Sequence, residues 1–310
     1  MLLLYPNMTI LDNITQSDVF VAYKKEGETP LECLTRLKDE GFLPSADKFT
    51  YAGRLDPMAE GLIIYLRGEA IKNKHHFLSL DKEYEVEVLL GIGTDTGDIL
   101  GLINSVVHGD VVFDLKNVQS ICESFVGEME VPYPWFSSKT LKGKPLYEWA
   151  REFASEEVET EIDMLNEENA DGESVGEKNT KETIDKDIFL RPMTKLSIKN
   201  IEFLNLSLIS NNNLLNNVVQ RIQKINGDFR QEEILHEWDK VSIKKKSKNT
   251  KEKIKNSKSD VDKEYPILKI KVKCGSGSYM RTLAELIGER LKVPALAYSI
   301  KRLSIGDYRV

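Results

Sequence analysis

One aspartate in this chain has neighbours that suit a chemical role. Asp56 lies between Leu55 and Pro57, in the stretch 51–61, which also contains Gly53. Glycine and proline at these spacings predict an ordered loop that holds the carboxylate rigidly and partly away from water. A carboxylate nucleophile or general base requires such a setting. Because Asp-Pro is also a common turn signal, the dipeptide alone leaves a purely structural role open.

The spacing of other ligand-type residues argues against a metal site. The run Thr94–Asp98 superficially resembles a calcium loop, but counted from Asp95 the position that needs a glutamate is occupied by Val106. His75 and His76 are adjacent and lack a third ligand close by in the sequence. We therefore expect no metal.

Cysteines and apolar runs indicate the cellular setting. Cys33, Cys122 and Cys274 are scattered, which fits neither a disulfide framework nor a CxxC metal motif. The apolar runs Leu2–Leu4 and Leu62–Leu66 are too short to cross a bilayer. The amino terminus has no basic stretch followed by an apolar core, as a secretory signal would. We expect a cytoplasmic protein with no membrane segment.

The helices and strands that must position Asp56 can be predicted from hydrophobic periodicity and from helix-capping residues. Thr29, Pro30 and Glu32 form a helix start with a cap, a first-turn proline and a capping-box glutamate, and Gly41 is a natural stop. Strands are predicted at Val19–Tyr23, Leu62–Leu66, Tyr84–Leu90, Lys195–Leu208 and Leu268–Cys274; helices are predicted at Pro30–Glu40, Glu69–Leu80, Phe113–Val126, Pro145–Phe153 and Tyr279–Leu291. Residues 91–101 are rich in turn formers. The pattern predicts one mixed domain over residues 1–310.

Charge is distributed unevenly along the 310 residues. The formal net charge is −7, with 41% hydrophobic and 30% charged residues, a globular composition. Residues 155–187 carry a local charge of −10, and the remainder sums to +3. Residues 244–258 carry eight lysines and one glutamate. We expect two polar insertions, an acidic one at 155–187 and a Lys-rich one at 236–264, and net charge does not exclude a nucleic-acid partner.

The run Tyr51–Ala70 resembles the catalytic motif H-x-G-x-L-D-P-x-A-x-G…G-E-A-T-K of TruB-type tRNA pseudouridine synthases. Further segments agree in order and spacing: Asp81–Tyr84 with D-K-x-Y, Gly93–Gly101 with T-D-T-x-D-x-x-G, Pro134–Ser138 with P-x-Y-S-A, Gly143–Glu148 with G-x-x-L-Y-E, Arg191–Thr194 with R-P-V-T, Gly277–Leu283 with G-T-Y-I-R-T-L, and Ile300–Leu303 with L-R-R-L. These collinear matches extend over most of the chain outside the two insertions.

This resemblance implies an α+β pseudouridine synthase fold, with a mixed, mostly antiparallel sheet flanked by helices. It implies an isomerase that cuts the uracil–ribose bond of a tRNA uridine, uridine 55 of the T-loop in the family, and rejoins it through carbon. The partner would be the T-arm of tRNA, with no cofactor, and we expect a monomer. The target nucleotide must be extruded from its stack to be reached.

Roles for individual residues are likewise implied by the resemblance. Asp56 matches the nucleophilic aspartate, Arg281 the arginine that pairs with it, and Tyr84 the tyrosine that stacks on the target base and takes part in proton transfer. Tyr279 and Ile300 match positions that line the uracil pocket. Asp98 would balance the charge of the arginine.

Plainer interpretations of these residues stay open from the sequence. Tyr84 is compatible with a core aromatic and Asp98 with a turn residue. Arg281 falls in the first turn of a predicted helix, where a cation is mildly unfavourable; a buried carboxylate partner would explain it, and so would simple surface exposure.

Departures from the family pattern bear on the target RNA. Tyr51 replaces the usual histidine, whose side chain fills the space left by the flipped base, and an aromatic ring can still do so. Arg54 replaces a small residue, and Gly-Arg-Leu-Asp is closer to the RluA and RsuA types. The chain ends at Val310 where most family members continue into a PUA domain. Two alternatives follow: a synthase for another tRNA or rRNA uridine, or a non-catalytic RNA-binding or RNA-folding module.

Overall fold

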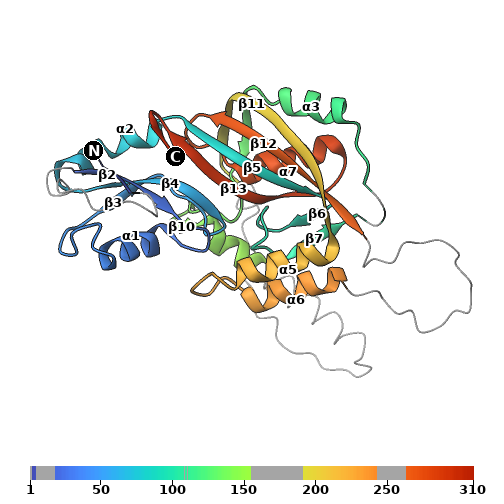
Figure 1. The fold of residues 1–310 in the computed structure, drawn as a ribbon, viewed down its shortest axis with the longest axis horizontal. Helices are drawn as coiled ribbons and strands as arrows, with labels where there is room; N and C mark the ends of the chain where they lie inside the picture. Colours follow the sequence, from blue (N-terminus) through green and yellow to red (C-terminus); the bar gives the residue numbers. More distant parts are fainter. Residues whose placement is uncertain (1, 5–17, 108, 110, 155–190, 243–262) are drawn as a thin grey trace, which may run out of the picture. The chain divides into compact units, whose positions relative to one another are not determined.

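The computed structural model describes residues 2–4, 18–107, 109, 111–154, 191–242 and 263–310. The contacts divide the chain into two compact units (Figure 1), unit 1 with Met1–Met129 and Leu196–Val310, and unit 2 with Glu130–Lys195. The predicted acidic insertion, and the Lys-rich insertion from residue 243 to residue 262, lie outside the described residues.

A mixed, mostly antiparallel sheet forms the centre of unit 1. Its strands lie in the order β1-β2-β4-β13-β5-β12-β11, with β3 beside β4 and β14 beside β13. Their bounds are β1 Leu2–Leu4, β2 Val19–Lys24, β3 Thr50–Ala52, β4 Ala59–Leu66, β5 Lys82–Leu90, β11 Met193–Ser210, β12 Glu264–Cys274, β13 Ala295–Ile305 and β14 Tyr308–Arg309. The pairs β1–β2 and β4–β13 are parallel. A hairpin of β6 (Ile92–Thr94) and β7 (Ile103–Val106) follows β5. The predicted α+β class is confirmed.

Helices cover both faces of β2 and β4, because alternate residues of a strand point to opposite sides. Helix α1 (Pro30–Asp39) packs on the face that carries Phe20 and Ile63, whereas α2 (Lys74–Ser79), after a 3₁₀ turn at Gly68–Asn73, packs on the face of Val21 and Ile64. Figure 1 shows the two helices on either side of these strands.

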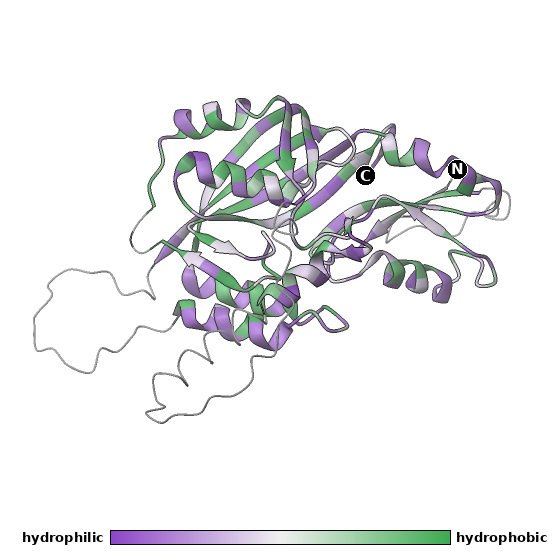
Figure 2. Cartoon of the chain, turned by 180° about the vertical axis from the view of Figure 1, so that it is seen from behind, coloured by the Kyte–Doolittle hydropathy of each residue, from purple (hydrophilic) through white to green (hydrophobic). Residues whose placement is uncertain are grey.

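The remaining helices of unit 1 cover the other half of the sheet. Their bounds are α3 Leu115–Glu123, α5 Asn211–Ile222, α6 Gln231–Ser242 and α7 Met280–Leu291. Helices α5 and α6 lie side by side (Figure 1), and their apolar faces join the core of β5, β12 and β13. Figure 2 shows hydrophobic and hydrophilic residues on different sides of these helices. Burial of the apolar face is the main stabilising term for such helices.

Several predicted elements agree with the structure, and others differ. The helix start at Thr29 is confirmed, since its hydroxyl and the Glu32 side chain form a capping box. The predicted loop over 51–61 is partly wrong, because β3 and β4 extend into it and leave only 53–58 as loop. The Lys-rich insertion does not begin at 236, because α6 continues to Ser242 and Trp238 is fully buried.

Unit 2 is small and rich in aromatic residues. It contains the carboxyl-terminal half of β8 (Gly127–Pro132), a hairpin of β9 (Thr140–Leu141) and β10 (Lys144–Pro145), and a helical segment at 146–154, as predicted. The rings of Trp149 and Phe153 stack with centroids 6.2 Å apart.

Candidate functional site

The loop that carries Asp56 is held at both ends. It begins after β3 and ends where β4 starts, with the amide of Ala59 donating to the Asp56 carbonyl at 3.0 Å. The amide of Gly27 donates to the Pro57 carbonyl at 2.9 Å. Leu55 and Met58 are buried at 5% and 4% exposure, whereas 41% of the Asp56 side chain is accessible. The loop therefore presents one carboxylate and buries its own apolar residues.

Lys24 at the end of β2 binds backbone carbonyls of this loop and of the residues next to it. Its fully buried ammonium donates to the carbonyls of Ala59 at 2.6 Å, Lys25 at 3.0 Å and Pro57 at 3.4 Å. Burial lowers the pKa of Lys24 to about 8. Three carbonyl acceptors satisfy the three donors of the ammonium, which offsets part of the desolvation cost.

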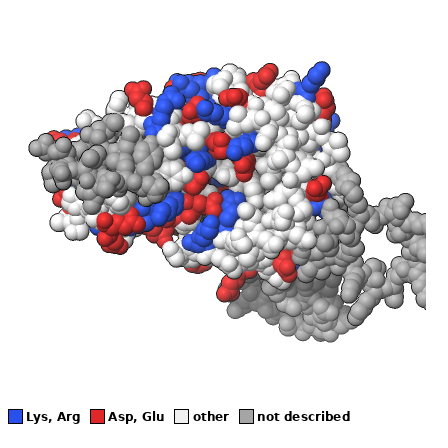
Figure 3. All heavy atoms as spheres, viewed as in Figure 1, with Lys and Arg blue, Asp and Glu red and all other residues white. Residues whose placement is uncertain are grey.

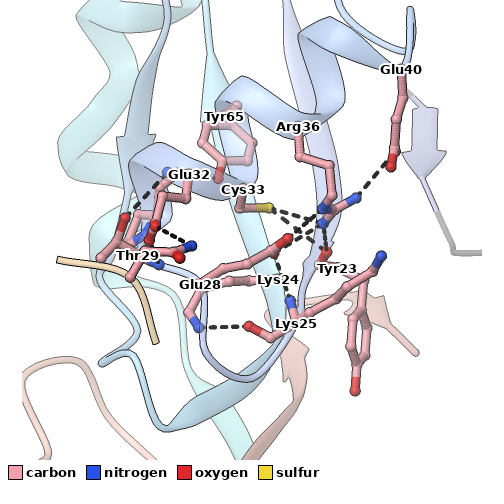
Figure 4. A network of polar contacts seen from close by, with 12 residues as sticks. Tyr23, Lys24, Lys25, Glu28, Thr29, Glu32, Cys33, Arg36, Glu40 and Tyr65 are labelled. Carbon is pink, nitrogen blue, oxygen red and sulfur yellow. Dashed lines mark hydrogen bonds and ion pairs between the residues drawn. The ribbon is translucent and has the colours of Figure 1, made fainter. Parts of the chain in front are cut away.

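A polar network fixes the segment between Lys24 and α1 (Figure 4). The guanidinium of Arg36 contacts both carboxylate oxygens of Glu28 and donates to the carbonyl of Tyr23 at 3.1 Å. The Cys33 thiol is 3.7 Å from the same carbonyl. This network anchors the turn that precedes α1 and therefore holds Lys24 against the Asp56 loop.

Arg281 connects the start of α7 to Asp56. Its Nε donates to Oδ2 of Asp56 at 2.9 Å and its Nη1 to the carbonyl of Thr96 at 2.6 Å. Oδ2 of Asp98 lies 3.9 Å from the same Nε. Burial lowers the pKa of Arg281, but the carboxylates of Asp56, Asp98 and Glu285 outweigh it, so the pKa is raised above its ordinary value. Surface exposure of Arg281 is excluded, because it is 4% exposed.

Asp98 is a buried carboxylate behind Arg281. Its Oδ1 accepts from the Thr96 hydroxyl at 2.8 Å and from the Leu100 amide at 2.9 Å. Burial raises the pKa of Asp98, and the Arg281 guanidinium opposes this rise. The residue belongs to a turn, as one interpretation expected, and it also faces the arginine. Its hydrogen bonds to Thr96 and Leu100 hold this carboxylate near the same Nε of Arg281 that donates to Asp56.

Tyr84 lies in β5 and is 7% exposed. Its phenol oxygen accepts from Nε of Arg302 at 3.1 Å, and the Arg302 guanidinium lies 5.4 Å from the centre of its ring. Burial raises the pKa of the Tyr84 phenol, Arg302 opposes this rise, and Asp56 adds to it. Asp56, Arg281 and Tyr84 thus belong to one electrostatically coupled group within unit 1.

The other predicted site residues lie on β3, on the Asp56 loop, on β13 and at the cap of α7. Tyr51 in β3 is half-buried, and the cations of Arg54 and Lys74 lie 5.9 Å and 5.8 Å from its ring centre. Arg54 itself is exposed. Ile300 in β13 is 7% exposed and opposes Val86 and Ala59 in the sheet. Tyr279 is half-buried at the amino-terminal cap of α7, two residues before Arg281.

Sequence reasoning did not single out Arg302 and Lys24 as site residues. Arg302 was part of a motif match only. Its strand alternates, with Ile300, Arg302 and Ser304 all buried on the inward side. A cation at an inward position of an alternating strand is the pattern that could have identified it. Lys24 is likewise a buried cation, at the end of the mostly apolar β2.

The described part of the chain shows neither a metal cluster nor a membrane helix. No group of three or more His, Cys, Asp and Glu residues there could hold a metal ion. No helix among these residues is long and apolar enough to cross a membrane. In Figure 3, lysine and arginine side chains are interspersed with acidic ones over part of the view, beside largely uncharged areas. One ion pair between β12 and β5 is that of Lys269 with Glu85, at 2.8 Å.

Chemically, the site offers one accessible carboxylate fixed by a buried guanidinium, with a buried phenol in electrostatic range. Such a carboxylate can attack an electrophilic carbon or accept a proton without first being oriented. A phenol in a low-dielectric setting donates a strong hydrogen bond to a polar group beside it. The site is suited to acid–base or covalent chemistry.

Part of this chain is similar to one family of known proteins. Residues 42–186 match the model of the TruB family pseudouridylate synthase N-terminal domain. A tRNA pseudouridine synthase B of Psychrobacter arcticus is 36% identical over 142 residues, 45% of this chain and 37% of that protein. The enzyme of the same name from Nitrosomonas europaea is 42% identical over 111 residues, 36% of each chain. The chain therefore spans less than half the length of these relatives. The TruB-type resemblance seen in the motifs is confirmed for residues 42–186.

Solved structures include chains with a partly similar arrangement. A chain in the crystal structure of a Cbf5–Nop10–Gar1 complex aligns with 94% of this chain and 49% of its own length, at 16% identity and a TM-score of 0.46. A chain in the structure of an H/ACA RNP bound to a substrate RNA aligns with a TM-score of 0.44 and 15% identity, over 94% of this chain and 48% of its own length.

Proposed function

We propose, from the TruB-type character of residues 42–186, that this chain is a tRNA pseudouridine synthase that acts on uridine 55 of the T-loop. The observation that carries the proposal is the ion pair between Arg281 and Asp56, 2.9 Å from Nε to Oδ2. It joins two segments that each match a family motif and leaves the carboxylate partly accessible.

Asp56 is the nucleophile in this proposal. Its carboxylate attacks the target uridine while the bond between the base and the ribose breaks. The base is then rejoined to the ribose through carbon as the bond to Asp56 breaks and frees the carboxylate. The proton lost from that carbon is balanced by one taken up at the ring nitrogen that left the ribose. No redox partner is needed, because the product is an isomer of the substrate. Arg281 holds the attacking oxygen in place, and Asp98 with Thr96 holds Arg281.

Extrusion of the target base needs compensation inside the site. Unstacking a nucleotide costs roughly a few kcal/mol. Stacking on an aromatic ring returns about 1–3 kcal/mol per base. We assign the stacking role to Tyr84, and we place Tyr279 and Ile300 along the uracil pocket. Tyr51 fills the space that the extruded base vacates.

The decisive experiment replaces Asp56 with asparagine, which keeps size and removes the charge. We expect the Asp56→Asn protein to bind a T-stem-loop RNA and to form no measurable pseudouridine. Asp39→Asn, an exposed change on α1, is the matched control and should convert the RNA at the wild-type rate. Wild-type conversion by the Asp56→Asn protein would refute the assignment.

Exposed Arg54 favours a second candidate target. The string Gly-Arg-Leu-Asp beside the nucleophile fits a synthase that modifies another tRNA or rRNA uridine. Mapping pseudouridines in the RNA of cells that lack the protein separates the two targets: loss confined to position 55 supports the first. A non-catalytic RNA-binding role predicts tight binding and no pseudouridine on any RNA.

A further inference from the structure

Arg302 is a buried cation that the proposed reaction does not yet use. It lies on the inward side of β13 and is 3% exposed. Its Nε donates to the phenol of Tyr84 at 3.1 Å, its Nη1 to the carbonyl of Leu62 at 3.1 Å, and its Nη2 to the carbonyl of Arg54 at 2.6 Å. One side chain therefore binds β5, β4 and the loop that carries Asp56.

The guanidinium is well suited to this arrangement. It is planar, and its donors point in fixed directions, so three acceptors bound at once fix their mutual positions. A lysine at this position has one ammonium centre and cannot reach three acceptors in the same fork geometry. Burial of such a cation is costly unless its donors are satisfied, which here requires Tyr84, Leu62 and Arg54 to stay in place.

The backbone around Arg302 is equally constrained. Gly61 opposes Arg302 in the parallel pair of β4 and β13. A Cβ atom built on Gly61 would lie 2.2 Å from the carbonyl oxygen of Arg302, and Gly61 has a φ of +115°. The two strands can approach this closely only with glycine at that position. The close strand contact at Gly61 therefore fixes the backbone of Arg302, and the three hydrogen bonds fix its guanidinium.

The direction of the hydrogen bond to Tyr84 has a chemical consequence. Arginine only donates, so the phenol oxygen accepts from Arg302 and must direct its own hydrogen elsewhere. In the ranges that the structure covers, no hydrogen bond donated by this phenol is present. Burial raises the pKa of the Tyr84 phenol, Arg302 opposes this rise, and Asp56 adds a smaller increase. The phenolic hydrogen is thus left for a polar group that enters beside Asp56.

We propose that Arg302 is a positioning residue for the isomerisation. It holds the Tyr84 phenol at a fixed place relative to the Asp56 loop and leaves the phenolic hydrogen directed at the bound uridine. This inference rests on the proposed function, because it assigns Arg302 a role in the same site. Arg302 acts through Tyr84 and touches no reacting atom.

A double-mutant cycle tests this coupling. Arg302→Gln, Tyr84→Phe and the double variant are compared by single-turnover conversion of a T-stem-loop RNA at saturating enzyme. Misplacement of a catalytic group by about 1 Å costs about 100-fold in rate, which is the loss expected for Arg302→Gln. In the Tyr84→Phe background the same change should cost about twofold or less, since the phenol it positions is gone. Lys301→Gln is the matched control; Lys301 lies 3.8 Å from Glu60 and should convert RNA normally when replaced.

Two results would overturn the inference. One is a wild-type rate for Arg302→Gln while the wild-type enzyme is active. The other is a loss that is the same in both backgrounds, which would mean that Arg302 only stabilises the fold. If Arg302→Gln does not fold, Arg302→Lys enters the same cycle. Failure of the proposed function is distinct: the wild-type protein itself would then form no pseudouridine on any RNA.

Discussion

Arg281 and Asp56 are 225 positions apart in the chain, yet Nε of the arginine donates to Oδ2 of the aspartate at 2.9 Å. The same Nε lies 3.9 Å from Oδ2 of Asp98, so one guanidinium nitrogen is close to two carboxylates. One carboxylate is 41% accessible and the other only 8%. The accessible group is free to meet a substrate, while the buried group keeps the arginine in place.

Removing Arg281 should destabilise the protein by leaving Asp98 as an unpaired buried charge. We expect Arg281→Met to lower the free energy of unfolding by about 3–5 kcal/mol, the usual cost of breaking a buried pair from one side. Adding Asp98→Asn to Arg281→Met should restore most of this loss, because the orphaned charge is then gone. Urea unfolding monitored by circular dichroism measures both values. Equal stabilities of the single and double variants would contradict this account.

The single variant Asp98→Asn should show whether Asp98 only positions Arg281 or takes part in the reaction itself. The amide keeps an oxygen that can accept from Thr96 and Leu100, and Arg281 keeps Asp56 as its partner. We expect activity to fall by about tenfold or less, whereas Asp56→Asn abolishes it. The measurement is the single-turnover rate of both variants on one RNA. A complete loss with Asp98→Asn would contradict a purely supporting role for Asp98.

Lys24 makes stability depend on pH in a definite direction. Burial lowers its pKa to about 8 in the folded state, below the ordinary lysine value near 10.5. Between these values the unfolded chain binds more protons, so the free energy of unfolding should rise with pH in this window. We expect the contribution of Lys24 to this rise to be about 3 kcal/mol and to be absent in Lys24→Met.

Denaturant titrations of wild type and Lys24→Met at a series of pH values between 7 and about 10 test this prediction. Their difference isolates Lys24 from the buried thiol of Cys33, whose pKa is raised to about 11 and whose effect has the opposite sign. Parallel pH curves for the two proteins would mean that the folded pKa of Lys24 is not lowered.

Gly61→Ala should be far more disruptive than an alanine at a comparable glycine. The new Cβ would meet the Arg302 carbonyl at 2.2 Å, so we expect a loss of about 3 kcal/mol or more. Gly41 also has a positive φ, +77°, but nothing lies within 4 Å of its added Cβ. Gly41→Ala should cost only about 1–2 kcal/mol, the cost of the left-handed conformation. Similar thermal midpoints for both variants would contradict a close approach at Gly61.

Arg54 should contribute to RNA binding through phosphate contact. It is exposed, and it lies with Lys74 around the ring of Tyr51 near the Asp56 loop. We expect Arg54→Gln to weaken T-stem-loop binding and to reduce the slope of log affinity against log salt by about 0.7–0.9. Lys72→Gln is the control, because Lys72 is exposed and paired with Glu69 at 2.6 Å. An unchanged slope for Arg54→Gln would remove Arg54 from the RNA interface.

Local sequence patterns determined many of the elements. The capping box at Thr29 and Glu32 and the alternation of Glu and apolar residues in β5 act between near neighbours, so they were readable without the fold. The strand β13 and the helices α5 and α6 were not predicted. Helix α5 is rich in asparagine and α6 in charged residues, and packing of Leu214 and Trp238 into a shared core stabilises these two helices.

By itself, the sequence determined that Asp56 is a constrained carboxylate and that Arg281 stands at the start of a helix. Only the tertiary structure decided that β13 lies between β4 and β5, and that α7 directs Arg281 at Asp56. The same strand order brings Arg302 to Tyr84 and to the Asp56 loop. Strand pairing depends on which distant segments bury one another's apolar faces, a property that no local window of the chain contains.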